Sequence, residues 1–268
     1  MPESSPREQA PTKYRPQSST GAPPPLPPVH EPSSFLADRT RSFARRGSRM
    51  PQGHQHAYDA MAERFVVSVP RSANGDDTSV DPTYRLDVER IFGRSAPLVI
   101  EVGSGSGDAL RAGAMARPNW NFLGLEVWRP GIGQTLSRMR ERPLPNLRLA
   151  EVDAALGLAT MIDANTATEV WTFFPDPWPK RKHHPRRLIN ATFADLVARV
   201  LLPGGMWRLA TDWAPYGLAM RSLLDGHDRF VVDSNARAPL RPKTRFEAKG
   251  LEVGRDIIDL NYVRPATR

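Results

Sequence analysis

Short apolar runs alternate with longer amphipathic segments along most of this chain, and this alternation constrains the fold more than any other feature. Between residues 97 and 211 the chain passes repeatedly from one kind of segment to the other. Parallel neighbouring strands need a crossover between them, usually a helix. The pattern therefore predicts an α/β fold with a mostly parallel, seven-stranded sheet and helices on both of its faces.

The expected elements follow from the two periodicities. Strands are expected at 97–102, 121–127, 146–152, 169–174 and 206–211, with two more at 229–233 and 256–262. Helices are expected at 57–67, 108–116, 131–141 and 187–202. Pro203, Gly204 and Gly205 are expected to stop the last of these helices.

The first 50 residues differ in kind from the rest. Their stretch GAPPPLPPVHEP disfavours helix and sheet, because proline lacks the amide donor and fixes φ. We expect a disordered tail at 1–50 and one folded domain at 51–268. The tail ends in an arginine-rich stretch that includes Arg45 and Arg46. This stretch is either a solvated linker or an arm that lies along phosphates.

The charge balance points to a polyanionic partner. Lys and Arg number 37 against 29 Asp and Glu, a net charge of +8, which favours nucleic acid first and an anionic membrane surface second. No apolar run approaches the ~20 residues that cross a bilayer, and no signal-peptide core is present. The absence of cysteine excludes disulfides and thiolate metal sites and is compatible with the cytoplasm. His183 and His184 lack metal-ligand spacing, so no metal is expected.

A glycine-rich turn joins the first expected strand to a helix in the stretch VIEVGSGSGDAL. Its glycines, Gly103, Gly105 and Gly107, follow a G-x-G-x-G spacing and not the G-x-G-x-x-G of dinucleotide sites. Glycine permits positive φ and close approach of a ligand. Asp108 follows at once and disfavours a pyrophosphate. Taken alone, the turn is also compatible with a simple strand-to-helix connection.

Three acids come at the ends of consecutive expected strands. Glu101 lies in the first strand, Glu126 near the end of the second, and Asp153 after the third. A carboxylate in the place of Glu126 suits ribose hydroxyls. Together the acids favour a cationic, amine-bearing nucleoside, and we expect S-adenosyl-L-methionine, with S-adenosyl-L-homocysteine as the product. Helix capping would explain one or two of these acids.

The stretch TFFPDPWPKRKHHPRR combines a rigid acidic turn with a basic block. Its prolines restrict the backbone, so Asp176 and Trp178 are expected to be held over the ligand crevice. Asp176 would accept hydrogen bonds, and Trp178 would stack on a base. The basic block is expected to contact the RNA phosphate backbone through Lys180, Arg181, Lys182, Arg186 and Arg187. The alternative is a proline-rich turn followed by a solvated charge run.

These motifs resemble those of the bacterial tRNA (guanine-N7)-methyltransferases. The similarity runs from residue 41 to 262 through IEVGSGSG, GLEVWRPGIG, NLRLAEVDA, FFPDPWPKRKHHPRRL, LLPGG, ATDWAPY and RPKTRFEAKG. The resemblance implies a class I methyltransferase domain with a Rossmann-like fold. It also implies methyl transfer to guanine N7 in the tRNA variable loop, position 46 in tRNA numbering, giving 7-methylguanosine. Both a monomer and a homodimer are compatible with it.

The resemblance also assigns residues. It places Glu101, Glu126, Asp153 and Asp176 in the cofactor pocket, beside Gly103 and Gly105, and makes Asp176 the catalytic residue. It makes the substrate-binding positions Lys180, Asp212, Thr244, Arg245, Phe246 and Glu247. Two positions depart from the family pattern: Ser104 stands where a bulky residue is usual, and Trp128 replaces a common His or Lys.

Two other functions remain open. The first is methylation of an amino group of adenine or cytosine, whose enzymes carry an Asp-Pro-Pro-aromatic turn; the stretch from Asp176 to Trp178 lacks the second consecutive proline. The second is a non-catalytic RNA-binding protein, against which the intact acids argue. For guanine N7 no proton has to leave before attack, so catalysis is expected to depend on orientation.

Overall fold

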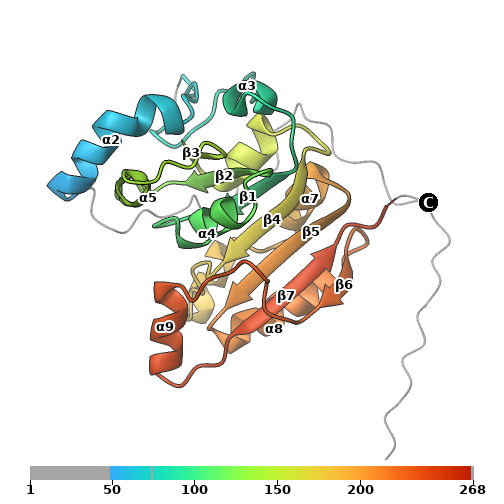
Figure 1. Cartoon of the computed structure of the whole chain (residues 1–268). Helices are drawn as coiled ribbons and strands as arrows, with labels where there is room; N and C mark the ends of the chain where they lie inside the picture. The colour runs from blue at the N-terminus through green and yellow to red at the C-terminus, as the bar shows by residue number, and fades with distance from the viewer. Residues whose placement is uncertain (1–48, 74, 267–268) are drawn as a thin grey trace, which may run out of the picture.

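The computed structural model describes residues 49–73 and 75–266. A seven-stranded sheet forms the centre of the fold (Figure 1). The strand order is β3-β2-β1-β4-β5-β7-β6. The strands are β1 (Leu98–Val102), β2 (Asn121–Glu126), β3 (Leu147–Glu151), β4 (Ala167–Phe173), β5 (Leu201–Thr211), β6 (Val231–Ser234) and β7 (Ile258–Val263). Neighbours among β1 to β5 run parallel, and β7 runs antiparallel to β5 and β6. The predicted fold class is confirmed.

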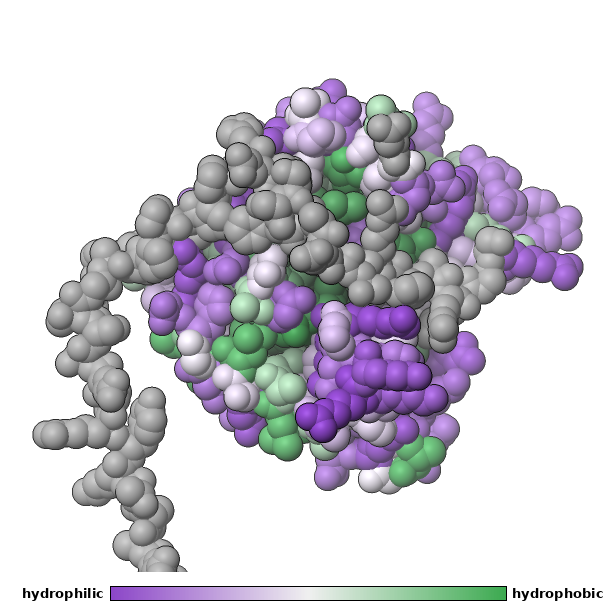
Figure 2. Space-filling view, turned by 180° about the vertical axis from the view of Figure 1, so that it is seen from behind, coloured by the Kyte–Doolittle hydropathy of each residue, from purple (hydrophilic) through white to green (hydrophobic). Residues whose placement is uncertain are grey.

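The helices lie on both faces of this sheet. They are α2 (Gln52–Phe65), α3 (Val88–Phe92), α4 (Asp108–Ala116), α5 (Arg129–Met139), α6 (Ala154–Leu156), α7 (Ala191–Val200), α8 (Ala214–Asp225) and α9 (Arg245–Glu252). A π-helix, η1 (Gly157–Met161), continues α6, and a 3-10 helix, η2 (Arg181–Arg186), follows β4. Viewed from the side opposite to Figure 1, hydrophilic residues predominate on the visible surface (Figure 2).

Strand β1 shows why the apolar runs are continuous. Leu98 and Ile100 point into a core shared with α7 and α8, whereas Val99 points into a second core shared with α2, α4 and α5. A strand buried on both faces cannot alternate with polar residues. Its three consecutive apolar residues, 98–100, are therefore typical of a strand in the middle of the sheet.

Helix α7 is shorter than predicted at both ends. It begins at Ala191, where the Asn190 side chain accepts a hydrogen bond from the Phe193 amide at 2.9 Å, and it ends at Val200. The predicted range 187–202 was wrong, because residues 187–190 precede the helix and Leu201 already belongs to β5, where it pairs with Ala167 of β4. The three residues from Pro203 to Gly205 accordingly lie within β5 and do not end the helix.

Helix α2 begins five residues before the predicted start at residue 57. Its first residues are mostly exposed and polar, so no apolar periodicity marks them. The predicted tail lies outside the described residues except for Arg49 and Met50, and Arg45 and Arg46 lie outside them as well. The Met50 side chain packs against Gly133 of α5.

The antiparallel direction of β7 decides what gathers at the carboxyl edge of the sheet. The parallel strands β1 to β5 all end there. The first residue of β7, Ile258, pairs with Thr211 at the end of β5, and Asp259 pairs with Ala210. The start of β7 therefore lies at the same edge as the ends of β4 and β5.

Candidate active site

The glycine loop between β1 and α4 has a backbone that only glycine adopts without strain. Gly103, Gly105 and Gly107 have φ values of 69°, 55° and 69°. A Cβ placed on Gly103 would meet no atom within 4 Å, and one on Gly105 would meet only a carbonyl oxygen at 4.0 Å. The loop thus leaves free space at these two positions, into which a ligand can approach the backbone.

Helix α5 packs directly on the other side of this loop. A Cβ on Gly107 would lie 2.5 Å from the Thr135 side chain, and one on Gly131 would lie 2.4 Å from the Gly105 carbonyl oxygen. Arg138 forms an ion pair with Asp108 at the start of α4. The loop is therefore fixed from behind and open only where Gly103 and Gly105 face outward.

Glu126, at the end of β2, ties the loop to the sheet. Its carboxylate accepts the Gly105 amide at 2.5 Å and the Trp128 amide at 2.8 Å. The sequence predicts contacts between this carboxylate and ribose hydroxyls. The structure adds a second task, since the same group holds the backbone of the glycine loop.

Glu101 is a buried carboxyl group with spare hydrogen-bonding capacity. It is 4% exposed, and its Oε2 atom has no hydrogen-bond partner among the described residues. Burial raises the pKa of Glu101 well above its ordinary value, and the nearby Glu126 and Asp108 carboxylates raise it further. A hydrogen bond from the Leu110 amide has a smaller, opposite effect on this pKa than burial. A cation or a hydrogen-bond donor at this position would relieve both the repulsion and the burial cost.

Asp153 acts as a helix cap. Its Oδ1 atom accepts the amides of Ala155 and Leu156 at 2.9 and 3.2 Å, which satisfies the first turn of α6. The alternative of simple capping therefore describes this acid. Glu101 also accepts an amide of a first helical turn, that of Leu110 in α4, whereas Glu126 accepts the amides of Gly105 and Trp128, which precede α4 and α5. Ser104, one of the two departures from the family pattern, is buried in the loop and packs against Gly124.

The turn after β4 carries Asp176 in an exposed position between two strained residues. Phe174 and Trp178 have φ values of 53° and 43°, in the left-handed region that side chains disfavour. Each such residue costs roughly 1–2 kcal/mol, so neighbouring contacts must hold the turn in this shape. We call residues 174–178 the Asp176 turn.

Two arginines hold the Asp176 turn from different sides. Arg187 donates from Nε to the Pro177 carbonyl oxygen at 3.0 Å, and its guanidinium lies 4.6 Å from the centre of the Tyr216 ring on α8. Arg241 places its guanidinium 5.3 Å from the centre of the Phe174 ring. Burial raises the pKa of Tyr216 to about 12, and the charge of Asp176 contributes to the rise.

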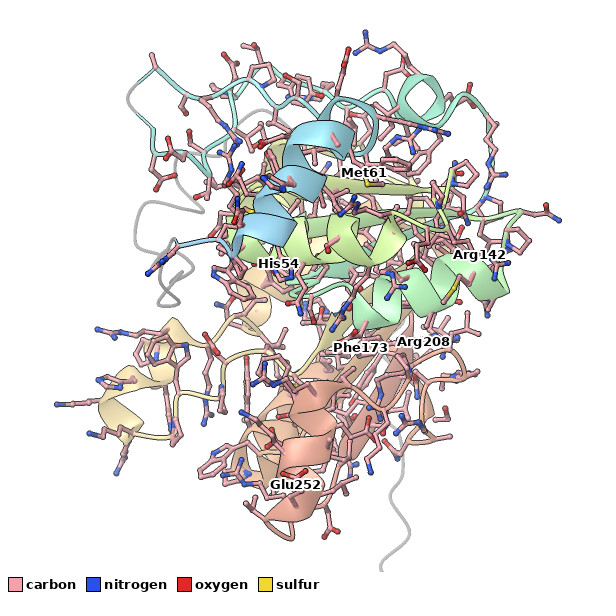
Figure 3. All side chains as sticks on the ribbon, turned by 60° about the vertical axis from the view of Figure 1, so that its left-hand side comes forward. His54, Met61, Arg142, Phe173, Arg208 and Glu252 are labelled. Carbon is pink, nitrogen blue, oxygen red and sulfur yellow. The ribbon has the colours of Figure 1, made fainter. Side chains whose placement is uncertain are left out.

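The predicted phosphate-binding residues fall into two groups. Lys180, Arg181 and Lys182 are exposed at the start of η2. The segment that contains η2 stands out from the body of the molecule, and nitrogen-tipped side chains on it point outward (Figure 3). Arg186 is half-buried with its guanidinium 5.2 Å from the Trp178 ring centre. Arg187 is also half-buried and is engaged with the Asp176 turn.

Apart from Lys180, which precedes η2, the predicted substrate-binding residues lie at the start of α9 or directly after β5. Thr244 caps α9 by accepting the Glu247 amide at 3.2 Å, and Arg245 and Phe246 are exposed in the first turn. Glu247 is buried and forms ion pairs with Arg237 and Arg241. Asp212 forms an ion pair with Arg255 at 2.7 Å and packs against Gly250 of α9.

Sequence reasoning missed Arg241, Asp259 and Arg237 as parts of this edge. The available signal was Asp259, an acid inside the apolar stretch IIDLNY, which needs a partner if the stretch is a buried strand. Among the described residues, no group of three or more His, Asp or Glu side chains has an arrangement that could hold a metal ion. Within residues 49–73 and 75–266, no helix has the length and apolarity needed to span a membrane.

A doubly wound sheet with a glycine loop and buried acids at its carboxyl edge defines a methyltransferase-type domain, and comparison with known proteins agrees. A family described as "Putative methyltransferase" matches residues 95–260. A crystal structure of the 16S rRNA methyltransferase KamB superposes with a TM-score of 0.51 at 16% identity, over 68% of this chain and 94% of that one. At that identity the likeness supports the fold alone.

Curated relatives narrow the family. A tRNA (guanine-N(7)-)-methyltransferase of Nocardioides sp. (strain ATCC BAA-499 / JS614) is 45% identical over 223 residues, which cover 83% of this chain and 86% of the relative. The protein of the same description from Arthrobacter sp. (strain FB24) is 45% identical over 80% of this chain and 67% of its own length. The one from Halorhodospira halophila is 41% identical over 85% and 97%. This chain belongs to the tRNA (guanine-N7)-methyltransferase family.

Proposed function

We propose that this protein transfers a methyl group from S-adenosyl-L-methionine to N7 of guanine 46 in the tRNA variable loop, giving 7-methylguanosine and S-adenosyl-L-homocysteine. The observation that carries the proposal is the position of the Asp176 turn at the same sheet edge as the glycine loop, in a chain whose relatives are described by this activity. The proposed location is the cytoplasm, where tRNA would be the partner.

The residues present suit S-adenosyl-L-methionine. Its amine and sulfonium are cationic, and the unpartnered Oε2 atom of Glu101 lies in a cluster of carboxylates. The open side of Gly103 and Gly105 lets a ligand approach the backbone, and Glu126 lies beside the loop to accept ribose hydroxyls. Asp153 and Asp176 complete the proposed cofactor-binding set. When bound, the cofactor supplies an electrophilic methyl group on sulfur.

The chain's own contribution is orientation and electrostatics. Guanine N7 has an in-plane lone pair, so no general base is required at that atom. Asp176 would accept hydrogen bonds from the N1–H and N2 amine edge of guanine and would stabilise the positive charge that develops on the ring. The guanine base would be held by Trp178 and by three residues at the start of α9: Thr244, Arg245 and Phe246. The remaining proposed substrate-binding residues are Lys180, Asp212 and Glu247.

The phosphate backbone of tRNA would meet the exposed cations of the basic block. Lys180, Arg181 and Lys182 are accessible as they stand. Arg186 and Arg187 are engaged with Trp178 and Pro177, so their contact with phosphate would add to an existing structural role. Arg45 and Arg46 are proposed for the same task from the sequence alone.

Methylation of a defined transcript tests the function. The protein is incubated with S-adenosyl-L-methionine and a tRNA transcript that carries guanine at position 46, and the nucleosides are analysed by mass spectrometry. We expect 7-methylguanosine, and none from a matched transcript with adenine at position 46. Methyladenosine or methylcytidine would instead support amino-group methylation, and cofactor binding without product would support a non-catalytic RNA-binding protein.

A further inference from the structure

Arg241 is a fully buried cation that joins two elements at the carboxyl edge. Its side chain is 0% exposed. It donates from Nη2 and Nε to the Asp259 carboxylate of β7, at 2.8 and 3.2 Å, and from Nη1 to Glu247 of α9 at 2.5 Å. One planar guanidinium therefore fixes α9 against the start of β7.

The same guanidinium reaches the end of β4. Its central carbon lies 5.8 Å from the ring centre of Phe173, the last residue of β4, and 5.3 Å from that of Phe174. Phe174 is the first residue of the Asp176 turn and has the strained φ of 53°. Arg241 thus contacts both sides of the proposed target site, the α9 side through Glu247 and the Asp176 side through the two rings.

The buried charges around Arg241 restrict its side chain to this position. Glu247 and Asp259 are both buried, and Arg237 completes the cluster by pairing with Glu247 and donating to the Arg241 carbonyl oxygen at 2.9 Å. Removing this buried cation would leave the Asp259 carboxylate without its ion pair and Glu247 with Arg237 alone. Lysine cannot reproduce the fork that binds both carboxylates at once.

We infer that Arg241 is a positioning residue for methyl transfer. It sets the first turn of α9, with Thr244, Arg245 and Phe246, in a fixed place relative to Asp176, so that a guanine held by α9 meets the Asp176 carboxylate and the methyl group in line. This inference rests on the proposed function and deepens it by assigning target placement to a residue that does not touch the target.

The experiment compares Arg241→Lys with Glu169→Gln. Glu169 is also buried and also forms ion pairs, with Arg117 at 3.0 Å and Arg208 at 2.8 Å, but it lies near the start of β4, toward the opposite edge of the sheet. Both changes disturb a buried ionic cluster linked to the same strand. For each variant we would measure thermal unfolding, affinity for S-adenosyl-L-methionine, and the single-turnover rate of 7-methylguanosine formation on saturating tRNA.

We expect Arg241→Lys to lower the rate by about 10- to 100-fold, as for a misplacement of reacting groups by about 1 Å, with cofactor affinity nearly unchanged. Glu169→Gln should keep the wild-type rate per folded molecule. Equal rates in the two variants, or a loss of cofactor affinity parallel to the loss of rate, would overturn the inference. If Arg241→Lys does not fold, Asp259→Asn, which keeps the Glu247 contact, carries the same comparison. A wild-type protein without 7-methylguanosine product would instead refute the proposed function.

Discussion

The carboxyl edge has two parts, the proposed cofactor side around the glycine loop and the proposed target side around the Asp176 turn, and they are built in different ways. On the cofactor side, the glycine loop is held by Glu126 at the end of the neighbouring strand β2 and by α5, the helix that follows β2. On the target side, the Asp176 turn is held by Arg187 and by Arg241, which comes from the segment before α9. One side is thus made by consecutive βα units, and the other by side chains from distant parts of the chain.

This difference has a consequence for mutational effects. The cofactor side depends on backbone conformations and on packing that belong to the sheet itself, so its integrity follows that of the fold. The target side depends on a few long side chains, and one substitution can displace it while the sheet persists. Substitutions on the cofactor side should therefore lower mainly the cofactor affinity, and substitutions on the target side should lower mainly the reaction rate.

The largest difference between the effect on the reaction rate and the effect on cofactor affinity is expected for Asp176→Asn. The new amide keeps the shape but presents donors to the donor edge of guanine, and the negative charge is lost. Methyl transfer should fall by about 100-fold or more, or about 2.7 kcal/mol, with far smaller change in cofactor binding because Glu101 and Glu126 remain. Single-turnover rates and calorimetry on the same variant measure both quantities.

Asp195→Asn is a suitable control, because this acid lies on α7 and its carboxylate makes only loose contacts, at 3.6 Å, with the side chains of His227 and Arg229. It should leave the rate unchanged. If Asp176→Asn retains a rate close to that of the wild type, Asp176 only shapes the turn and the comparison of the two sides loses its catalytic meaning.

The opposite separation is expected for Glu126→Ala. Cofactor affinity should weaken by about 1–3 kcal/mol, through loss of contacts to ribose hydroxyls and through release of the Gly105 amide. Calorimetry measures the effect, and Glu151→Ala, which removes a carboxylate from the end of the adjacent strand, is the control. An unchanged affinity in a folded Glu126→Ala variant would remove this residue from the cofactor site.

A smaller effect is expected in the salt dependence of tRNA binding. Replacing Lys180, Arg181 and Lys182 together by alanine should reduce the slope of log affinity against log salt by about 2–3, since each phosphate contact contributes roughly 0.7–0.9 to the slope. Arg187→Gln should change the slope less and the rate more, because Arg187 is engaged with Pro177. If the triple variant has the same slope as the wild type, the basic block is a solvated surface that does not contact the RNA.

The smallest expected effect is a pH dependence on the cofactor side. The pKa of Glu101 is raised in the folded protein, so between the ordinary value near 4.5 and the raised one the folded state holds a proton that the unfolded state has lost. Stability of the ligand-free protein should fall as pH rises through this window. A cationic ligand favours the ionised carboxylate, so cofactor affinity should rise with pH over the same range.

Calorimetry at several pH values tests this linkage, with proton release on binding as a second readout. Glu101→Gln should remove the pH dependence of affinity that this carboxyl group causes. If affinity in the wild type stays constant with pH, the cofactor's cationic group does not lie against Glu101.

The sequence predicted the sheet and the glycine loop because both leave local signatures, a periodicity and a spacing. It failed at the end of α7, where Leu201 continues an apolar helical pattern but is the first residue of β5 and pairs with Ala167 of β4. The buried acid Asp259 indicated that an ion-pair partner was needed, but the sequence did not indicate that this partner is Arg241. Which buried acid meets which arginine depends on strand order and direction, and nothing within a short window of sequence specifies these.

The reversed direction of β7 also offers a practical handle. Asp259 lies at the carboxyl edge, while Arg264, after the strand end, exchanges backbone hydrogen bonds with Gly204 and Gly205 at the opposite edge. At ~3.3 Å per residue, the strand separates these two places by roughly 15 Å or more. An immobilisation tag or fluorophore attached after β7 would therefore leave unobstructed the edge that is proposed to bind tRNA, which suits surface-based binding assays of this protein.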